Sequence, residues 1–255
     1  MPQASNDLSQ YRELAPANLH YDASAKRYVA TPEFAPRFLA LSADRYLSQL
    51  RAKAEGVISL DETWIGVAPD AQAMPVPARR VDPLLFRDLL TVMREGASIE
   101  VQYQSMSPRR PDSLWRRITP HAFGSDGLRW HVRGYCHLDG DFKDFILSRW
   151  RALRDKASAG ASAAADQDWT ETFSVELRPN PALSASQQEA VAWEYDMPKG
   201  RSALSVRKAL LYYLKKRLRL DVATDSPAET PVVVANRDEF EIALASAKGE
   251  VRGGI

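Results

Sequence analysis

The sequence predicts an α+β protein in which helical patterns lie on either side of a central run of strands. Apolar residues recur at a helical period up to about Gly96, and from Ser98 onward they alternate with polar residues at a period of two. Hydrophobic residues make up 45% of the 255 positions and charged residues 26%, which is typical of a chain that buries a core. At about 150 residues per domain, this length allows one large domain or two to three small ones.

The N-terminal region predicts a small hairpin followed by a helix. Residues 18–21 and 27–30 are short Tyr-containing segments joined by a polar connection of hairpin length, which places Lys26 and Arg27 near the tip. A helix is predicted over residues 42–55, because a serine stands at its N-cap position and a glycine follows its last turn.

A second helix is predicted to begin at Asp82, with Pro83 in the first helical position and Gly96 as its terminator. Its predicted apolar stripe consists of Leu85, Leu89, Leu90 and Met93. A segment with three prolines in nine residues, 69–77, precedes this helix and favours a linker.

Consecutive antiparallel strands are predicted next, with Asp-Gly turns before the last two. The strand segments are residues 98–106, 115–123, 129–138 and 142–151. The C-terminal region mixes both patterns, with strands at 172–177 and 230–235, helices at 206–218 and 238–247, and a strand or helix end at 191–195.

The strand at residues 129–138 has two different faces, because successive side chains of a strand point in opposite directions. The predicted core face carries Trp130, Val132, Gly134, Cys136 and Leu138. The opposite face carries Arg129, His131, Arg133, Tyr135 and His137. Guanidinium and imidazole donors beside an aromatic ring can engage phosphates and bases, which favours an anion-binding face. The alternative is a solvated outer surface of a sheet.

Charge is distributed unevenly along the chain, although the total of 34 basic and 33 acidic residues gives a net charge of only +1. Residues 79–154 carry 14 basic and 9 acidic residues, and residues 199–219 carry 8 basic residues and no acidic one. The remaining segments are acidic. These two basic islands indicate an anionic partner, although a solvated basic helix would account for part of the second island.

The sequence lacks the motifs of several enzyme classes and of membrane-spanning proteins. Cys136 is the only cysteine, which excludes a disulfide framework and a cysteine-based zinc site. The sequence contains no P-loop, no dinucleotide-binding glycine fingerprint and no nucleophile elbow, and its histidines lack the zincin spacing. No apolar run approaches the ~18 residues of a membrane span. We expect a cytoplasmic protein without catalytic residues, metal or cofactor.

Three segments, Trp130-His131-Val132, Gly134-Tyr135-Cys136 and the FKDFILSR of residues 142–149, together resemble a WYL domain. A WYL domain is an Sm-like or SH3-like β-barrel that binds effectors in bacterial transcription regulators; here His131 and Val132 replace the Tyr and Leu of the motif. With residues 14–22 and Lys26-Arg27-Tyr28, the chain looks most like the BrxR/CapW-type repressors of phage-defence operons.

The resemblance implies a homodimer that binds double-stranded operator DNA through a winged helix-turn-helix. It divides the chain into a remnant of the winged helix domain at residues 1–40, a helical linker at 41–78, a WYL domain at 79–155 and a small α/β dimerisation domain at 169–255. Because the wing-like hairpin begins at about residue 18, we expect no room for a recognition helix before it and therefore an incomplete helix-turn-helix.

We expect a DNA-binding transcriptional regulator that acts as a repressor. Its WYL domain is expected to sense a nucleotide or single-stranded nucleic-acid effector. The expected effector-binding residues are His131, Arg133, Tyr135, Tyr103, Ser105, His121 and Arg149, and the expected DNA contacts are Lys26 and Arg27. Two alternatives stay open. The chain could be a stand-alone nucleotide-sensing or interaction module without duplex DNA binding or, with less support, a nuclease that uses His121 or His131.

Overall fold

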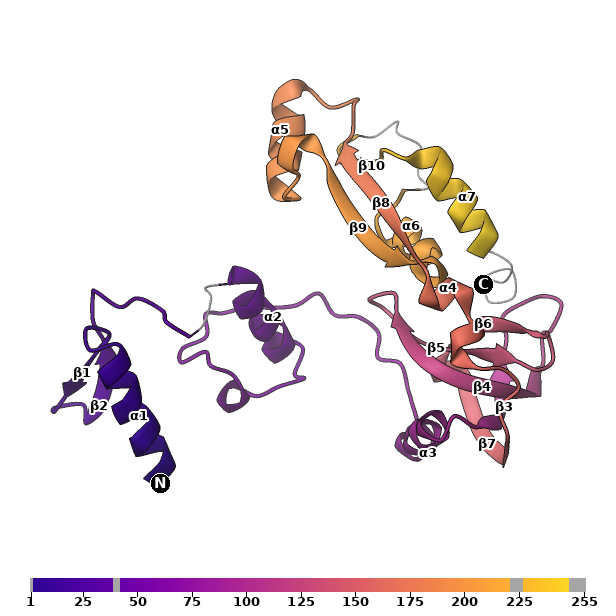
Figure 1. Ribbon diagram of the computed structural model, residues 1–255, viewed down its shortest axis with the longest axis horizontal. Helices are drawn as coiled ribbons and strands as arrows, with labels where there is room; N and C mark the ends of the chain where they lie inside the picture. The colour runs from indigo at the N-terminus through magenta and orange to yellow at the C-terminus, as the bar shows by residue number, and fades with distance from the viewer. Residues whose placement is uncertain (1, 39–41, 221–226, 248–255) are drawn as a thin grey trace. The chain divides into compact units, whose positions relative to one another are not determined.

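The computed structural model describes residues 2–38, 42–220 and 227–247, and the chain divides into two compact units between Val76 and Pro77. The first unit contains helix α1 (Pro2–Leu14), strands β1 (Leu19–Asp22) and β2 (Arg27–Ala30), helix α2 (Ala43–Ala54) and the 3-10 turn η1 (Leu60–Glu62), all shown in Figure 1. The second unit holds the remaining strands and helices.

The predicted hairpin is confirmed, with Leu19 paired to Ala30 and Asp22 paired to Arg27. One carboxylate oxygen of Asp22 accepts from the backbone N–H groups of Ser24 and Ala25, at 2.9 and 3.0 Å, and so holds the turn closed. Lys26 has a φ of +50° at the tip. The turn therefore presents its two basic residues side by side.

Helix α1 lies directly before this hairpin, so a helix does occupy the segment in which the sequence predicted no room for a recognition helix. Arg12 in its last turn donates to the Tyr28 hydroxyl at 3.2 Å, and Asn18 donates to the Tyr11 hydroxyl at 2.8 Å. The apolar pattern did not mark this helix because most of its side chains are exposed and only Leu8 and Tyr11 are half-buried. Tertiary contacts with the hairpin stabilise it instead.

Helix α2 begins where its cap predicted, since the Ser42 side chain accepts from the Arg45 backbone N–H at 3.2 Å. Leu50 on this helix is buried, as is Ile65 in the segment that follows. The rings of Tyr46 and Trp64 pack with centroids 5.7 Å apart. These contacts form the small core of α2 and its following loop.

The second unit begins with helix α3 and a five-stranded antiparallel sheet in the order β6-β5-β4-β3-β7. These elements are α3 (Pro83–Arg94), β3 (Ser98–Gln104), β4 (Ser113–Ser125), β5 (Trp130–Cys136), β6 (Asp141–Ile146) and β7 (Trp150–Ala157). The predicted single strand over residues 142–151 was wrong, because the 3-10 turn η2 (Leu147–Arg149) interrupts it. That turn carries the chain from one edge of the sheet to the other, where Trp150 pairs with Tyr103.

Helix α3 packs on the sheet through Leu85, Leu89 and Val92, which recur at the i, i+4, i+7 spacing of one helical face. Leu90, predicted to lie on this stripe, is 44% exposed. Asp82 caps the helix as predicted, with its carboxylate accepting from the backbone N–H groups of residues 84 and 85. The helix therefore covers the sheet core with one narrow stripe.

Strand β5 is covered on both faces in its middle. Val132 and Cys136 lie in the core, as predicted, and burial raises the pKa of the Cys136 thiol. The predicted core positions Trp130 and Leu138 were wrong, since they are 58% and 57% exposed. They lie at the two ends of the strand, beyond the reach of the packed layer. His131 and Arg133 on the opposite face are buried as well.

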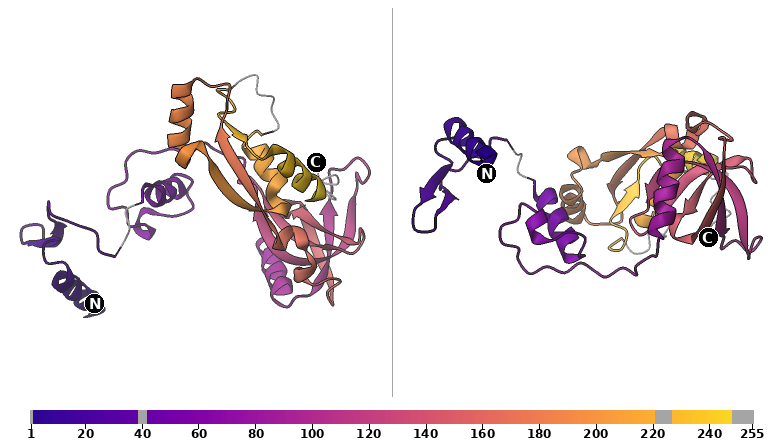
Figure 2. Two further views of the ribbon diagram at one scale, coloured as in Figure 1. Left: turned by 45° about the horizontal axis from the view of Figure 1, so that its top comes forward. Right: turned by 90° about the horizontal axis from the view of Figure 1, so that it is seen from below.

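The C-terminal lobe is a three-stranded antiparallel sheet in the order β10-β8-β9, with α6 and α7 packed on one face (Figure 2). Its elements are α4 (Gln167–Thr170), β8 (Thr172–Pro179), α5 (Ala185–Glu194), β9 (Ser202–Arg207), α6 (Leu211–Arg217), β10 (Val232–Val234) and α7 (Arg237–Ala247). The helix predicted over 206–218 starts only at Leu211, because Val206 pairs with Phe173 in the sheet. Residues 191–195 are the end of a helix. Within the described ranges, no helix is long and apolar enough to cross a membrane.

Replacing Leu89 with Ala is expected to destabilise the second unit by about 2–5 kcal/mol, because its fully buried side chain would leave a cavity between α3 and the sheet. The neighbouring change Leu90→Ala is the matched control and should cost less than about 1 kcal/mol. Urea denaturation followed by circular dichroism measures both free energies of unfolding. Equal losses for the two variants would contradict this packing.

Candidate functional site

A pocket of about 970 Å³ lies between the five-stranded sheet and helix α6, within the second unit. This volume falls in the range of ~300–1,000 Å³ that is usual for small-molecule sites. Nine of its lining side chains are arginine or lysine and three are aspartate. The excess of cations favours an anionic ligand.

Four of the predicted effector-binding residues line this pocket: Tyr103, His131, Arg133 and Arg149. The structure brings them together from β3, β5 and the η2 turn. Tyr103 is fixed by two contacts, since its hydroxyl accepts from the Ile146 backbone N–H at 3.2 Å and its ring meets Phe145 edge-on at 5.2 Å.

The other three predicted residues do not line the pocket. Ser105 is buried and its hydroxyl accepts from the Ser107 backbone N–H at 3.1 Å. His121 lies 2.9 Å from an oxygen of Asp166. Tyr135 packs edge-on against Phe142, with ring centroids 5.4 Å apart. Their contacts with Ser107, Asp166 and Phe142 serve the packing around the site.

Arg133 is held by a bidentate ion pair with Asp166, which lies just before α4. Its Nε donates to one carboxylate oxygen at 2.7 Å and its Nη2 to the other at 2.9 Å. Burial opposes ionisation of Asp166, but the hydrogen bonds from Arg133 and His121 outweigh it and lower the pKa of Asp166 to about 2. This pair binds the sheet to the segment that leads into the C-terminal lobe.

A second polar cluster joins the sheet to helix α6. The Tyr213 hydroxyl donates to a carboxylate oxygen of Asp144 at 3.1 Å, and the Tyr213 ring lies 4.6 Å from the His131 ring. Arg217 donates to the backbone oxygen of Asp126 at 2.9 Å. Helix α6 therefore forms one wall of the pocket and is bonded to the opposite wall.

Protonation in this cluster follows from burial and pairing. Burial lowers the pKa of His131, so the ring is neutral at pH 7 and above. Burial also raises the pKa of Asp144 and, together with Asp144, that of Tyr213. Burial disfavours the ionised form of Asp126, but hydrogen bonds from the backbone of Leu128 and from Arg129 prevail and lower its pKa to about 2. At neutral pH the pocket therefore contains a neutral His131 ring and an ionised Asp126.

Other pocket residues were not among the predicted effector-binding residues. Arg116 on β4, Arg129 before β5, and Lys216 and Arg217 on α6 all line the pocket. For Lys216 and Arg217 the one available signal was the charge of the second basic island, +8 over residues 199–219. It could not show that this helix faces the first island.

The candidate DNA-contacting residues lie in the first unit. Lys26 and Arg27 are exposed at the hairpin tip. Helix α1 also exposes Asn6 and Gln10, which are four residues apart and therefore share a face. Among the residues whose positions are described, no group of three or more His, Cys, Asp and Glu side chains is arranged to hold a metal ion.

Three family profiles match the chain in order. They are the BrxR transcriptional regulator winged helix-turn-helix domain over residues 1–52, the WYL domain over residues 85–155, and the BrxR transcriptional regulator C-terminal dimerization domain over residues 172–240. The first profile extends through most of helix α2. The WYL profile covers the five-stranded sheet.

Curated proteins named DNA-binding transcriptional repressor CapW are similar over most of the chain. The protein from Stenotrophomonas maltophilia is 38% identical over 243 residues, which is 94% of this chain and 81% of the relative. The protein from Escherichia coli strain KTE188 is 34% identical over 242 residues, 94% of this chain and 80% of its own. The protein from Pseudomonas aeruginosa is 34% identical over 243 residues, which is 94% of this chain and 81% of that relative.

These matches agree with the α+β fold, the hairpin-bearing first unit and the WYL resemblance noted in the sequence. Profiles for all three domains occur in one chain, and the identity to the relatives exceeds 30% along most of both sequences. The chain therefore belongs to the BrxR/CapW family of WYL-domain transcriptional regulators.

Proposed function

We propose that this protein is a DNA-binding transcriptional repressor that acts as a homodimer and whose pocket binds an anionic effector, a nucleotide or short single-stranded nucleic acid. The observation that carries the effector part is the pocket itself, in which nine cations lie between the five-stranded sheet and a helix of the C-terminal lobe. Similarity to CapW repressors supports the DNA-binding part. A C-terminal dimerization profile supports the homodimer.

Duplex DNA is proposed to bind the first unit. Helix α1 precedes the hairpin in the order that a recognition helix precedes a wing. Its exposed Asn6 and Gln10 are side chains suited to hydrogen bonding with base edges, and Lys26 and Arg27 are suited to phosphates. We propose a role in the cytoplasm at the operon of a phage-defence system, as the sequence resemblance implies.

Effector binding is proposed to alter DNA affinity through helix α6. A ligand shifts a conformational equilibrium only if it binds one state more tightly than the other. Tyr213 and Arg217 of α6 already contact Asp144 and Asp126 across the pocket. An anion that competes for Arg217 or for the Tyr213 hydroxyl would change how the dimerisation lobe is bonded to the sheet, which is the differential contact that coupling requires.

A non-enzymatic role fits the state of the two histidines that a nuclease would use. His121 is engaged by Asp166, and His131 lies between Asp126 and Tyr213. Turnover of nucleic acid over a panel of divalent metals would contradict this part of the proposal. A stand-alone sensing module is the other candidate, and operator binding by this chain would exclude it.

The double variant Lys26→Ala/Arg27→Ala is expected to weaken binding to the protein's own promoter DNA and to reduce the salt slope of the affinity by about 2, because two phosphate contacts are lost. Fluorescence anisotropy over a range of salt concentrations measures both effects. The control is Arg151→Ala/Arg178→Ala, which removes two exposed cations of the second unit. Identical behaviour of the two double variants would contradict the assignment of the hairpin.

The variant Arg149→Ala is expected to retain promoter binding and to bind nucleotides or short oligonucleotides about tenfold less tightly, because a cation of the pocket is lost. Isothermal titration calorimetry against nucleoside monophosphates and single-stranded oligonucleotides measures this affinity. Arg151→Ala, two residues further along and exposed, should bind as the wild type does. A loss in the control as large as in Arg149→Ala would argue against a pocket site.

A further inference from the structure

We propose that one end of this pocket is a receptor for a terminal phosphate group, and that Arg116 is its buried donor. This inference rests on the proposed function, because it specifies which chemical group of the effector the pocket recognises. It predicts that a phosphorylated chain end, and not the internal phosphodiester backbone, supplies the decisive contact.

Arg116 is a buried cation that the protein leaves partly unsatisfied. Its side chain comes from β4, opposite Val101 of β3, and the residue is 5% exposed. The Nε and Nη2 atoms have no hydrogen-bond partner. Among the described residues no carboxylate lies within ion-pair distance of this guanidinium. Buried donors and charges of this kind are costly unless a partner arrives, so an anionic ligand is the physical expectation.

The three carboxylates of the pocket lining are engaged by groups other than Arg116. Asp126 accepts from Arg129, Asp139 accepts from Arg110, and Asp144 accepts from the Tyr213 hydroxyl. Each of the three aspartates that line the pocket is therefore hydrogen-bonded to a residue other than Arg116. The end of the pocket around Arg116 is left without an acidic residue.

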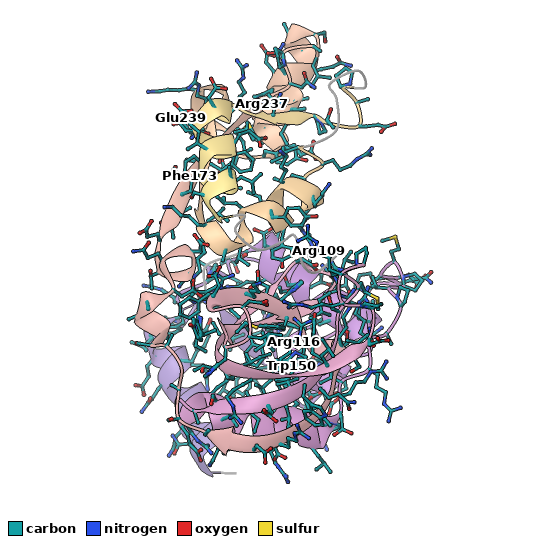
Figure 3. The ribbon with its side chains drawn as sticks, turned by 90° about the vertical axis from the view of Figure 1, so that its right-hand side faces the viewer. Arg109, Arg116, Trp150, Phe173, Arg237 and Glu239 are labelled. Carbon is teal, nitrogen blue, oxygen red and sulfur yellow. The ribbon has the colours of Figure 1, made fainter. Side chains whose placement is uncertain are left out.

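The surroundings of Arg116 hold it in one orientation. Its guanidinium lies over the Tyr103 ring, 5.5 Å from the centroid. Tyr103 pairs with Trp150 on β7, and Figure 3 shows Arg116 and Trp150 within the sheet with Arg109 nearer the C-terminal lobe. Arg109, exposed in the loop between β3 and β4, and Arg149, in the turn before β7, also line the pocket. The buried Arg116 is therefore held in place, and Arg109 and Arg149 add further positive charge to the same pocket.

The depth of Arg116 points to a chain end. An internal phosphodiester continues on both sides, so it reaches a buried donor only if two nucleosides are buried with it. A terminal phosphate enters end-on, presents three oxygens and carries close to two negative charges at neutral pH. The planar fork of an arginine matches phosphate oxygens in a bidentate manner. Nucleoside monophosphates and phosphorylated oligonucleotide ends share this group.

The test uses the full chain and short oligothymidylates that carry a 5′-phosphate, a 3′-phosphate or only hydroxyl ends, with thymidine monophosphate as the smallest probe. Fluorescence anisotropy competition gives the affinities. We expect at least one phosphorylated end to bind about tenfold or more tightly than the hydroxyl form. If thymidine monophosphate also binds tightly, a free nucleotide is sufficient to fill the site. If thymidine monophosphate binds weakly while a phosphorylated oligothymidylate binds tightly, the ligand is the end of an oligonucleotide.

The variant Arg116→Met should abolish the preference for the phosphorylated end, so that the phosphorylated and hydroxyl forms bind with similar affinity. It should also melt at the same or a higher temperature without ligand, because an uncompensated buried charge has been replaced by an apolar side chain of similar length. Arg117→Met is the matched control. Arg117 is the next residue of β4, donates to the Asp155 carbonyl at 2.8 Å and does not line the pocket, so its variant should keep the preference.

Arg109→Ala provides a second variant that does not disturb the core, and we expect it to reduce the phosphate preference two- to fivefold, that is by roughly 0.4–1 kcal/mol. Equal binding of phosphorylated and hydroxyl ends by the wild type, or an unchanged preference in Arg116→Met, overturns this inference and leaves the proposed effector pocket standing. Absence of binding by every probe overturns both the inference and the nucleotide effector of the proposed function.

Discussion

The ion pair between Arg133 and Asp166 is the interaction on which the second unit depends. Both side chains are nearly inaccessible, and two hydrogen bonds of 2.7 and 2.9 Å join them. A buried guanidinium is tolerated only when a carboxylate satisfies it, and removal of one partner from such a pair typically costs about 3–5 kcal/mol. Because Asp166 belongs to the segment between β7 and β8, satisfying Arg133 also places the start of the C-terminal lobe against the sheet.

The pocket is a consequence of that placement. Once the C-terminal lobe is bonded to the sheet, helix α6 faces β5, and Tyr213 and Arg217 make their contacts with Asp144 and Asp126. The two basic islands of the sequence then line one cavity. Four of the nine pocket cations, Arg110, Arg129, Arg133 and Lys143, pair with an aspartate. The buried Nε and Nη2 atoms of Arg116 have no hydrogen-bond partner among the described residues. The same physical rule, that a buried charge requires a partner, thus distinguishes Arg133, which is paired within the fold, from Arg116, which we propose pairs with a ligand.

The pocket is bounded by two of the domains that define the family. Within the second unit, the cavity is bounded by the sheet of the WYL domain and by a helix from the region that matches a dimerization profile. A ligand that binds there contacts both. Under the proposed function, an effector in this pocket would act directly on the dimerisation lobe, without a long chain of side-chain couplings.

Local patterns in the sequence were enough to predict the α+β class, the hairpin, the Ser42 and Asp82 caps and the core positions Val132 and Cys136, because caps and periodicities depend on neighbouring residues. The motif segments also determined the family. The sequence marked the basic face of β5, but only the tertiary structure decided which of its residues are engaged. His131 and Arg133 on this face contact residues 126, 144, 166 and 213. The period of a strand predicts which side chains share a face, but it does not predict which distant residues pack against that face. Strand pairing of Val206 with Phe173 decided where helix α6 starts. The placement of distant carboxylates decided that Arg116 has no ion-pair partner among the described residues, and neither outcome can be predicted from residues that are close along the chain.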